Sequence, residues 1–345
     1  MLSFESDYTE GAHEKILEKL LETNREKLSG YGKDIYCQNA KEKIKSLCHC
    51  KHAEVAFLVG GTQTNATVID ALLHSCEGVI APSTGHISLH EAGAIEASGH
   101  KVLEIPEHHG KIKNNELRDF LQNFWCEQNK EHMVYPGMVY LSHPTEYGTL
   151  YTAKELQEIA ALCRQYKIPL YLDGARLGYA LTAQNTDVTL PLLASLCDVF
   201  YIGGTKVGAL CGEAIVFPKN NMPKQFMNIV KQHGALLAKG RLLGIQFDCL
   251  FTDNLYFEIS AHGNHMAKKL KEIFQKYHFS FYIESPTNQQ FIILNNHQIE
   301  KLKNHVAFSF WERLNEQETV VRFATSWATE EEDIQALDSL LSTIL

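Results

Sequence analysis

The feature that most constrains this sequence of 345 residues is a repeated unit, in which a short apolar run ends at a glycine turn and an amphipathic segment follows. In one copy, an expected strand over 54–59 stops at Gly60 and Gly61, and an expected helix over 62–73 begins. This alternation predicts an α/β fold, a mainly parallel sheet covered by helices, with ligands beyond the carboxyl ends of the strands. Further strands are expected at 78–81, 101–105, 138–141, 168–172, 199–202 and 213–217, and helices at 13–25, 36–49, 88–97, 117–124 and 152–166.

The pattern changes in the last third of the chain. Strands are expected at 291–294, 307–310 and 319–324, and a last helix is expected to begin at a capping box formed by Thr329 and Glu332. We therefore predict three parts, which are an N-terminal segment and helix that packs with the small domain or a neighbouring subunit (1–29), a large domain (30–249) and a smaller C-terminal α+β domain (250–345).

Composition excludes several classes of protein. The formal net charge of −9 disfavours nucleic acid and anionic membranes as partners. We find no N-terminal signal and no apolar run near the roughly 20 residues that span a bilayer. Nine scattered cysteines indicate reduced thiols in a cytoplasmic protein. Cys48, Cys50 and His52 resemble half of a zinc site, but no second cluster completes four ligands, so no metal site is predicted.

Lys206 follows the expected strand at 199–202, after Gly203 and Gly204 and among small residues. This setting favours an amine that loses its proton and attacks a carbonyl, as a Schiff-base lysine does. The alternative is a solvated lysine at a strand end.

Asp173 ends an earlier expected strand. A carboxylate in that position is costly unless it is paired, and the protonated ring nitrogen of pyridoxal phosphate is a suitable partner. The alternative is a cap of the short helix that follows. Because Lys206 comes one crossover later, the cofactor interpretation is the stronger one.

Three further positions could bind a cofactor or substrate. Gly61, Thr62 and Gln63 open a helix, whose free N–H groups suit a phosphate, although the turn is neither a dinucleotide fingerprint nor a P-loop. His86 follows a strand and could stack on a flat ring, or be a structural histidine. Arg322 shares a strand face with small apolar residues, which suggests a buried anion rather than an exposed arginine.

Taken in chain order, the glycine turn, His86, the Asp173-Gly-Ala-Arg176 block and the Gly-Gly-Thr-Lys206 block resemble the L-threonine aldolase and aromatic amino acid β-eliminating lyase family. The resemblance runs from Phe4 to Trp327. It implies an aspartate-aminotransferase type of fold, pyridoxal 5'-phosphate as cofactor, and a homo-oligomer, dimer or tetramer, with active sites at subunit interfaces.

The resemblance also implies roles for individual residues. Lys206 would form the Schiff base, Asp173 would pair with the pyridine nitrogen, and His86 would stack on the ring. The phosphate would be held by Gly61, Thr62 and Gln63. Arg176 would lie beside the cofactor and the substrate carboxylate, which Arg322 would bind with help from Ser6. Tyr31 and Arg241 are weaker candidates that would reach a neighbouring site.

The sequence departs from the family at one loop. Many threonine aldolases carry a Glu-Asn-Thr-His motif after the fifth strand, whereas this chain has Ser142-His143-Pro144-Thr145-Glu146, a form similar to the low-specificity branch. The implied reaction is cleavage of the Cα–Cβ bond of L-threonine or L-allo-threonine to glycine and acetaldehyde. His86, His143 or a water would take the β-hydroxyl proton. The alternatives are β-elimination at the same site, with Lys206 as the Cα base, and a non-catalytic α/β binding or assembly protein.

Overall fold

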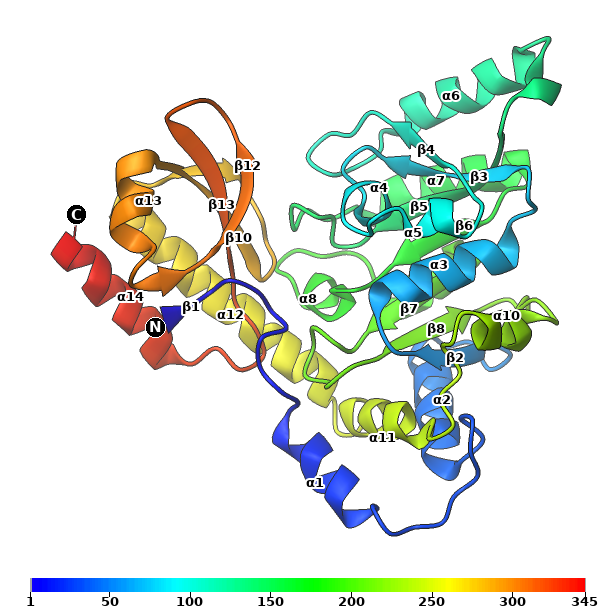
Figure 1. Ribbon diagram of the computed structural model, residues 1–345, viewed down its shortest axis with the longest axis horizontal. Coiled ribbons are helices and arrows are strands. Elements are labelled where there is room, and N and C mark those ends of the chain that lie inside the picture. Colours follow the sequence, from blue (N-terminus) through cyan, green and yellow to red (C-terminus); the bar gives the residue numbers. More distant parts are fainter. Residues whose placement is uncertain (1, 345) are drawn as a thin grey trace.

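A seven-stranded sheet forms the centre of the large domain in the computed structural model, which describes residues 2–344 (Figure 1). Only β8 runs opposite to the other strands of this sheet, so the prediction of a mainly parallel sheet is confirmed. In spatial order the strands are β2 (Glu54–Leu58), β8 (Glu213–Phe217), β7 (Val199–Gly203), β6 (Leu170–Asp173), β5 (Tyr135–Ser142), β3 (Glu77–Pro82) and β4 (Val102–Ile105).

Helices cover both faces of this sheet, and strands such as β7 are therefore buried on both sides. Phe200 and Ile202 point into one apolar cluster, and Val199 and Tyr201 point into the other. The first cluster is closed by α2 (Ile35–Leu47), α6 (Asn114–Cys126), α7 (Ala153–Tyr166), α8 (Leu177–Leu181), α9 (Leu190–Leu196) and α11 (Arg241–Leu250). The second is closed by α3 (Gly61–Leu72), α4 (His86–Leu89), α5 (Ala94–Ala97) and α10 (Phe226–Gln232).

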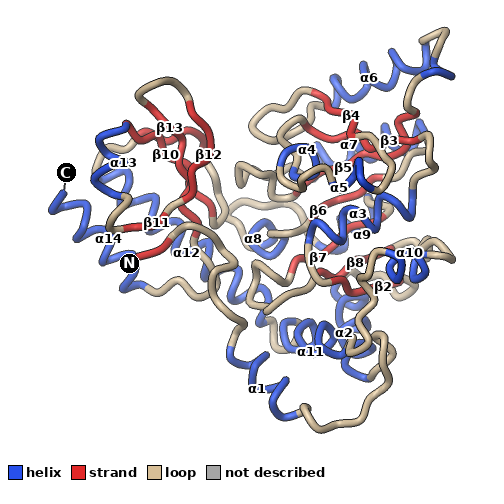
Figure 2. The backbone as a smooth tube through the Cα atoms, in the orientation of Figure 1, coloured by secondary structure: helices blue, strands red, loops and turns tan. Residues whose placement is uncertain are grey.

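The small domain is an antiparallel sheet packed against helices, and Figure 2 shows its strands as a group separate from the large sheet. Its strands, in spatial order, are β12 (Ser309–Arg313), β13 (Glu318–Ala324), β10 (Gln289–Asn295) and β9 (Ser280–Ile283). The helices are the long α12 (Leu255–Lys276), which runs from the large domain into the small one, α13 (Asn296–Leu302) and α14 (Glu331–Ile344).

The N-terminal segment contacts both domains. Strand β1 (Leu2–Ser3) pairs in parallel with β11 (Val306–Ala307) of the small domain, whereas α1 (Glu14–Glu22) lies against α11 of the large domain. Phe4 enters the core of the small domain, where its ring centroid is 6.1 Å from that of Phe323. On these contacts we propose to keep the division into 1–29, 30–249 and 250–345.

Two local predictions were wrong. The helix expected at 88–97 is two short helices, α4 and α5, because Ala92 and Gly93 have φ of 52° and 72° and interrupt the helix. Thr329 does not cap α14, since its hydroxyl accepts a hydrogen bond from Ser326 N, which precedes it in the chain. At the start of α14 it is the Asp333 carboxylate that accepts a hydrogen bond, from Glu330 N at 3.0 Å. Strands β1 and β9 were not predicted. The capping box of α7, built by Thr152 and Glu155, is confirmed.

Among residues 2–344, none of the helices combines the length and the apolar character that crossing a membrane requires.

Candidate active site

The candidate residues of the large domain gather at one edge of the sheet. His86 follows β3, Ser142 ends β5, Asp173 ends β6 and Lys206 follows β7. The start of α3 follows β2 at the same edge, because β2, β3, β5, β6 and β7 all run in one direction. This is the edge at which α/β sheets bind their ligands.

Asp173 is the centre of a buried hydrogen-bond network. Its Oδ1 accepts bonds from Ala175 N (2.9 Å) and the Tyr201 hydroxyl, and its Oδ2 accepts from Asn65 Nδ2 (2.9 Å) and the Tyr140 hydroxyl (2.7 Å). Four donors compensate the cost of burying this charge. The alternative of a helix cap is wrong, because the residue at the start of α8 is Arg176, without a side-chain cap.

Lys206 lies in a turn that is fixed from several sides. Its carbonyl accepts a bond from the Tyr179 hydroxyl at 2.8 Å. Gly208, two residues on, has φ of 79°, and a side chain there would collide with Ile259. Burial lowers the pKa of Lys206, and the neighbouring Arg176 lowers it further. The lysine is therefore suited to lose its proton, as a nucleophilic amine must.

The first turn of α3 presents N–H groups toward the same edge. The Thr64 N–H is the first that bonds back into the helix, to Gly60 O at 2.9 Å, so those of Gly61, Thr62 and Gln63 precede the helical ladder. A Cβ on Gly61 would stand 3.3 Å from the Tyr201 hydroxyl. The turn thus lies close to the Asp173 network and offers donors for an anion.

His86 is held by a buried carboxylate. Its Nδ1 lies 2.7 Å from Glu91 Oε1, which also accepts a bond from Asn65 Nδ2 at 2.7 Å. Burial lowers the pKa of His86, but the hydrogen bond with Glu91 and the nearby Glu146 raise it, and the net shift is upward. Asn65 therefore joins His86 to Asp173. Asn65 and Glu91 belong to the sequence stretches that contain Gly61 and His86, but the sequence alone assigned neither of them a role.

Two arginines approach from different parts of the chain. Arg176 donates to both oxygens of Asp7, through Nε (2.6 Å) and Nη2 (2.9 Å), and its Nη1 takes no part in this pair. Arg322, on β13, donates to Gln289 Oε1 and Ser309 Oγ, both at 3.1 Å. Burial lowers the pKa of Arg322, and the charge of Arg176 adds to this. Two buried cations that repel one another favour an anionic ligand between them.

Ser6 lies next to the Asp7–Arg176 pair in the N-terminal segment. It is buried, and its hydroxyl has no partner within residues 2–344. A buried hydroxyl without a partner suits a ligand that brings one. The structure thus brings Ser6, Arg176 and Arg322 toward the sheet edge that carries Lys206, from three separate parts of the sequence.

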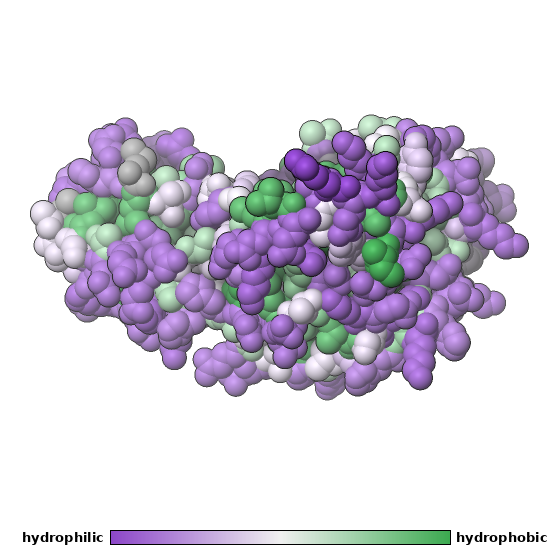
Figure 3. All heavy atoms as spheres, turned by 90° about the horizontal axis from the view of Figure 1, so that it is seen from below, coloured by the Kyte–Doolittle hydropathy of each residue, from purple (hydrophilic) through white to green (hydrophobic). Residues whose placement is uncertain are grey.

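Tyr31 and Arg241 lie elsewhere, on the α1–α11 side of the molecule. Arg241 donates to the carbonyls of Thr23 and Glu26, and Tyr31 is 48% exposed. Figure 3 shows this lower face, where apolar side chains interrupt a polar surface. Neither residue joins the site of this protomer.

His143 does not reach the site, so the hypothesis that it takes a proton from substrate is wrong. It is completely buried, neither ring nitrogen has a partner within the described residues, and burial lowers its pKa to about 4. The charges that act on it are those of Lys111, Asp187 and Glu155, whereas Glu146, three residues on, acts on His86 and Lys206.

Pyridoxal phosphate fits this edge of the sheet. The N–H groups at the start of α3 suit its phosphate. The Asp173 carboxylate, which also accepts bonds from neighbouring tyrosine hydroxyls, suits its ring nitrogen, and the Lys206 amine suits its aldehyde. For a metal, no group of three ligating side chains occurs within residues 2–344. The thiol of Cys50, in the half-site suggested by the sequence, donates instead to Pro218 O.

Comparisons with known proteins agree with this chemistry. The low-specificity L-threonine aldolase of Pseudomonas aeruginosa is 29% identical over 337 residues, which are 97% of this chain and 95% of that protein. A solved structure of Leishmania major threonine aldolase is 42% identical, with a TM-score of 0.96 and 99% of both chains covered. An aspartate aminotransferase of Thermus thermophilus shares the fold alone, at 14% identity and a TM-score of 0.72, covering 100% of this chain and 92% of that one.

The resemblance inferred from the sequence motifs is confirmed by the family model described as beta-eliminating lyase, which matches residues 3–297. This match spans the whole large sheet and all of the large domain's candidate residues, and it ends in α13, before β12 and β13. The chain therefore belongs to the beta-eliminating lyase family.

Proposed function

We propose that this protein is a pyridoxal-phosphate-dependent aldehyde-lyase. It cleaves the Cα–Cβ bond of a β-hydroxy-α-amino acid, converting L-threonine or L-allo-threonine to glycine and acetaldehyde. The observation that carries this proposal is the position of Lys206 and Asp173 at one edge of the sheet, where Asp173 ends β6 and Lys206 follows β7. The threonine aldolases of Leishmania major and Pseudomonas aeruginosa, similar over almost the whole chain, support the substrate class.

When bound, the cofactor supplies an electron sink for the pair freed at Cα. Lys206, whose pKa is lowered by burial, would provide the uncharged amine that holds the cofactor aldehyde. Four donors hold the Asp173 carboxylate, which would face the ring nitrogen of the cofactor. Gly61, Thr62 and Gln63 would hold its phosphate through their N–H groups, and His86 would lie against its ring.

The substrate carboxylate binds to Arg322, with the free nitrogen of Arg176 and the hydroxyl of Ser6 beside it. Arg322 is fixed by Gln289, by Ser309 and by Trp311, whose ring centroid lies 5.4 Å from the guanidinium carbon. A carboxylate fixed in this way would restrict rotation of the bound substrate and so hold its Cα–Cβ bond in one orientation. This is an orientation effect, which lowers the entropic part of the barrier.

β-Elimination at the same site is the alternative reaction. The family description and the altered loop at 142–146 favour it over other amino-acid reactions. In this case Lys206 removes the Cα proton, and the products are ammonia and a keto acid. Assaying both pairs of products from one incubation distinguishes the two reactions.

We also propose a homo-oligomer, a dimer or a tetramer, with active sites at the subunit interfaces. Large apolar side chains are exposed on α1 and at the start of α2, where Leu17, Leu21 and Ile35 are 47%, 77% and 51% exposed. A monomer rarely exposes several such residues together. The nine cysteines are free, which supports a cytoplasmic location.

The test is an absorbance spectrum of the purified protein with and without excess L-threonine, coupled to an acetaldehyde assay. A visible band that changes with threonine, together with acetaldehyde, is the expected result. Lys206→Ala should abolish both turnover and the lysine-dependent band. A band that responds to amino acids without release of any aldehyde would transfer the proposal to β-elimination.

A further inference from the structure

Glu146 lies in the loop between β5 and α7, at the end of a chain of side chains that begins at Asp173. The Tyr140 hydroxyl donates to Asp173 Oδ2 at 2.7 Å and lies 3.2 Å from Ser142 Oγ. Ser142 Oγ in turn donates to Glu146 Oε1 at 2.9 Å. Two hydroxyls therefore connect the carboxylate of Glu146 to the carboxylate at the centre of the site.

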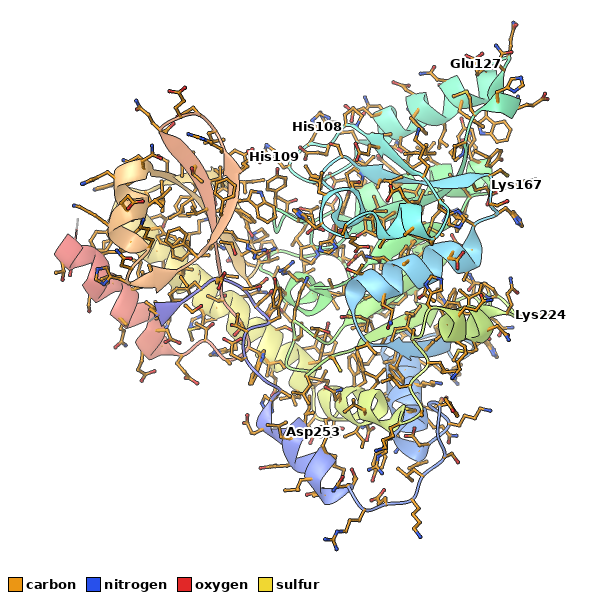
Figure 4. All side chains as sticks on the ribbon, viewed as in Figure 1. His108, His109, Glu127, Lys167, Lys224 and Asp253 are labelled. Carbon is orange, nitrogen blue, oxygen red and sulfur yellow. The ribbon has the colours of Figure 1, made fainter. Side chains whose placement is uncertain are left out.

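The loop that carries Glu146 is held from both domains. Thr145 N donates to Thr149 O (2.9 Å), and the Thr149 hydroxyl donates to His109 O (2.6 Å), in the loop that Figure 4 labels between the two domains. On the other side, the Thr287 hydroxyl of the small domain donates to Gly148 O at 3.1 Å. These bonds fix the backbone on both sides of Glu146, so its carboxylate is presented by a rigid loop.

Tyr147 connects this loop to the proposed carboxylate-binding arginine. The Tyr147 ring packs on Trp311, with 5.7 Å between centroids, and the guanidinium of Arg322 lies over the same indole. Glu146 is thus connected to Asp173 through Ser142 and Tyr140. The next residue, Tyr147, packs on Trp311, which also contacts Arg322. A substrate bound to Arg322 would have to lie beside this loop.

The electrostatic environment of Glu146 agrees with this position. Its charge acts on Lys206, Arg176, His86 and His90 of the large domain and on Arg322 of the small domain. Glu146 itself is 9% exposed. The set of candidates that sequence reasoning left open for the β-hydroxyl proton did not include this residue, and His143 is excluded by its burial.

We propose that Glu146 is the catalytic residue that accepts the β-hydroxyl proton, and that Ser142 is a positioning residue that orients its carboxylate. The inference rests on the proposed aldol cleavage. The proton moves from the hydroxyl to a carboxylate oxygen of Glu146, and the O–H electron pair becomes the second C–O bond of the aldehyde. The Cα–Cβ bond breaks, and its pair stays with Cα. A proton then adds at Cα to give glycine, and Glu146 returns to the carboxylate form.

The test compares two reactions of the holoenzyme, one of which needs no β-hydroxyl base. Cleavage of L-threonine needs Glu146, whereas exchange of the α-proton of glycine in D2O, followed by NMR, needs only the cofactor, Lys206 and Asp173. For Glu146→Gln we expect cleavage to fall by about 10²–10⁴-fold, with exchange retained within a few-fold. Glu146→Asp, which keeps a carboxylate, should recover part of the cleavage rate.

Glu312→Gln is the matched control, because Glu312 also contacts this loop, accepting a bond from the Tyr147 hydroxyl at 3.3 Å, and is assigned no role in the proposed site. It should leave both reactions within a few-fold. Equal losses of cleavage and exchange in Glu146→Gln would overturn the proposal, as would normal cleavage. If the wild-type protein exchanges the α-proton of glycine but releases no aldehyde from threonine, the proposed function itself fails. That result is seen in the wild type and can therefore be told apart from the two Glu146→Gln results that would overturn the role of Glu146.

Discussion

Arg176 donates to both carboxylate oxygens of Asp7, at 2.6 and 2.9 Å, and so joins the N-terminal segment to the loop after β6. The two residues are 169 positions apart in sequence, and neither side chain is exposed by more than 8%. Asn288, from the small domain, also donates to Asp7 at 2.9 Å. One buried ion pair therefore connects three parts of the chain beside the site.

Asp7→Asn should destabilise the fold by about 3–5 kcal/mol, because removing one partner leaves the charge of Arg176 buried without compensation. The measurement is the thermal midpoint of the apoprotein. Asp7→Glu, which keeps the charge, should lose less. Midpoints within experimental error of wild type for Asp7→Asn would contradict the assignment.

The same pair predicts how stability depends on pH. Burial alone would raise the pKa of Asp7, but the charge and hydrogen bonds of Arg176 lower it to about 2, from an ordinary value of 3.8. A lowered pKa stabilises the folded state above the unfolded value, and this contribution is lost as the pH falls through the folded value. The difference in thermal midpoint between wild type and Asp7→Asn should therefore be full at pH 7 and shrink below about pH 4.

Tyr140 and Tyr171 provide a comparison inside the Asp173 network. The Tyr140 hydroxyl donates to the charged Asp173, whereas the Tyr171 hydroxyl donates to the neutral Asn65 Oδ1 at 2.6 Å. Both rings are completely buried, so the Phe variants remove the same atom from the same kind of surroundings. A bond to a charged group contributes about 1.5–3 kcal/mol and a neutral one about 0.5–1.5. Tyr140→Phe should lower the thermal midpoint more than Tyr171→Phe, and the reverse order would contradict this account.

Much of the site could be predicted from the sequence because strand ends are local features. Lys206 and Asp173 each follow a buried apolar run, and parallel strands bring such ends to one edge. The alternation of side chains along β5 also indicates which way His143 points. Ser142 shares a face with Tyr140, so the next residue, His143, must point to the opposite face.

Other features had no local signal. Asp7 pairs with Arg176 only because the N-terminal segment crosses from the small domain to the large one, through β1 and α1. Asn65 lies in the middle of α3, where its sequence context is that of an ordinary helix, and its bonds to Glu91 and Asp173 depend on how α3 packs on the sheet. Contacts of this kind are set by tertiary packing and not by periodicity.

Gly148 offers a test of the loop that carries Glu146. It has φ of 71°, and a Cβ there would stand 2.7 Å from Thr287 Oγ1 and closer still to Ser285 Oγ. Gly148→Ala should therefore lower the thermal midpoint and reduce threonine cleavage, because the loop must move away from the small domain. Gly234→Ala is the control, since Gly234 has φ of 67° but open space around it. The control carries only the strain of the left-handed backbone, about 1–2 kcal/mol. Equal effects of the two substitutions on cleavage would show that contact with the small domain does not position Glu146.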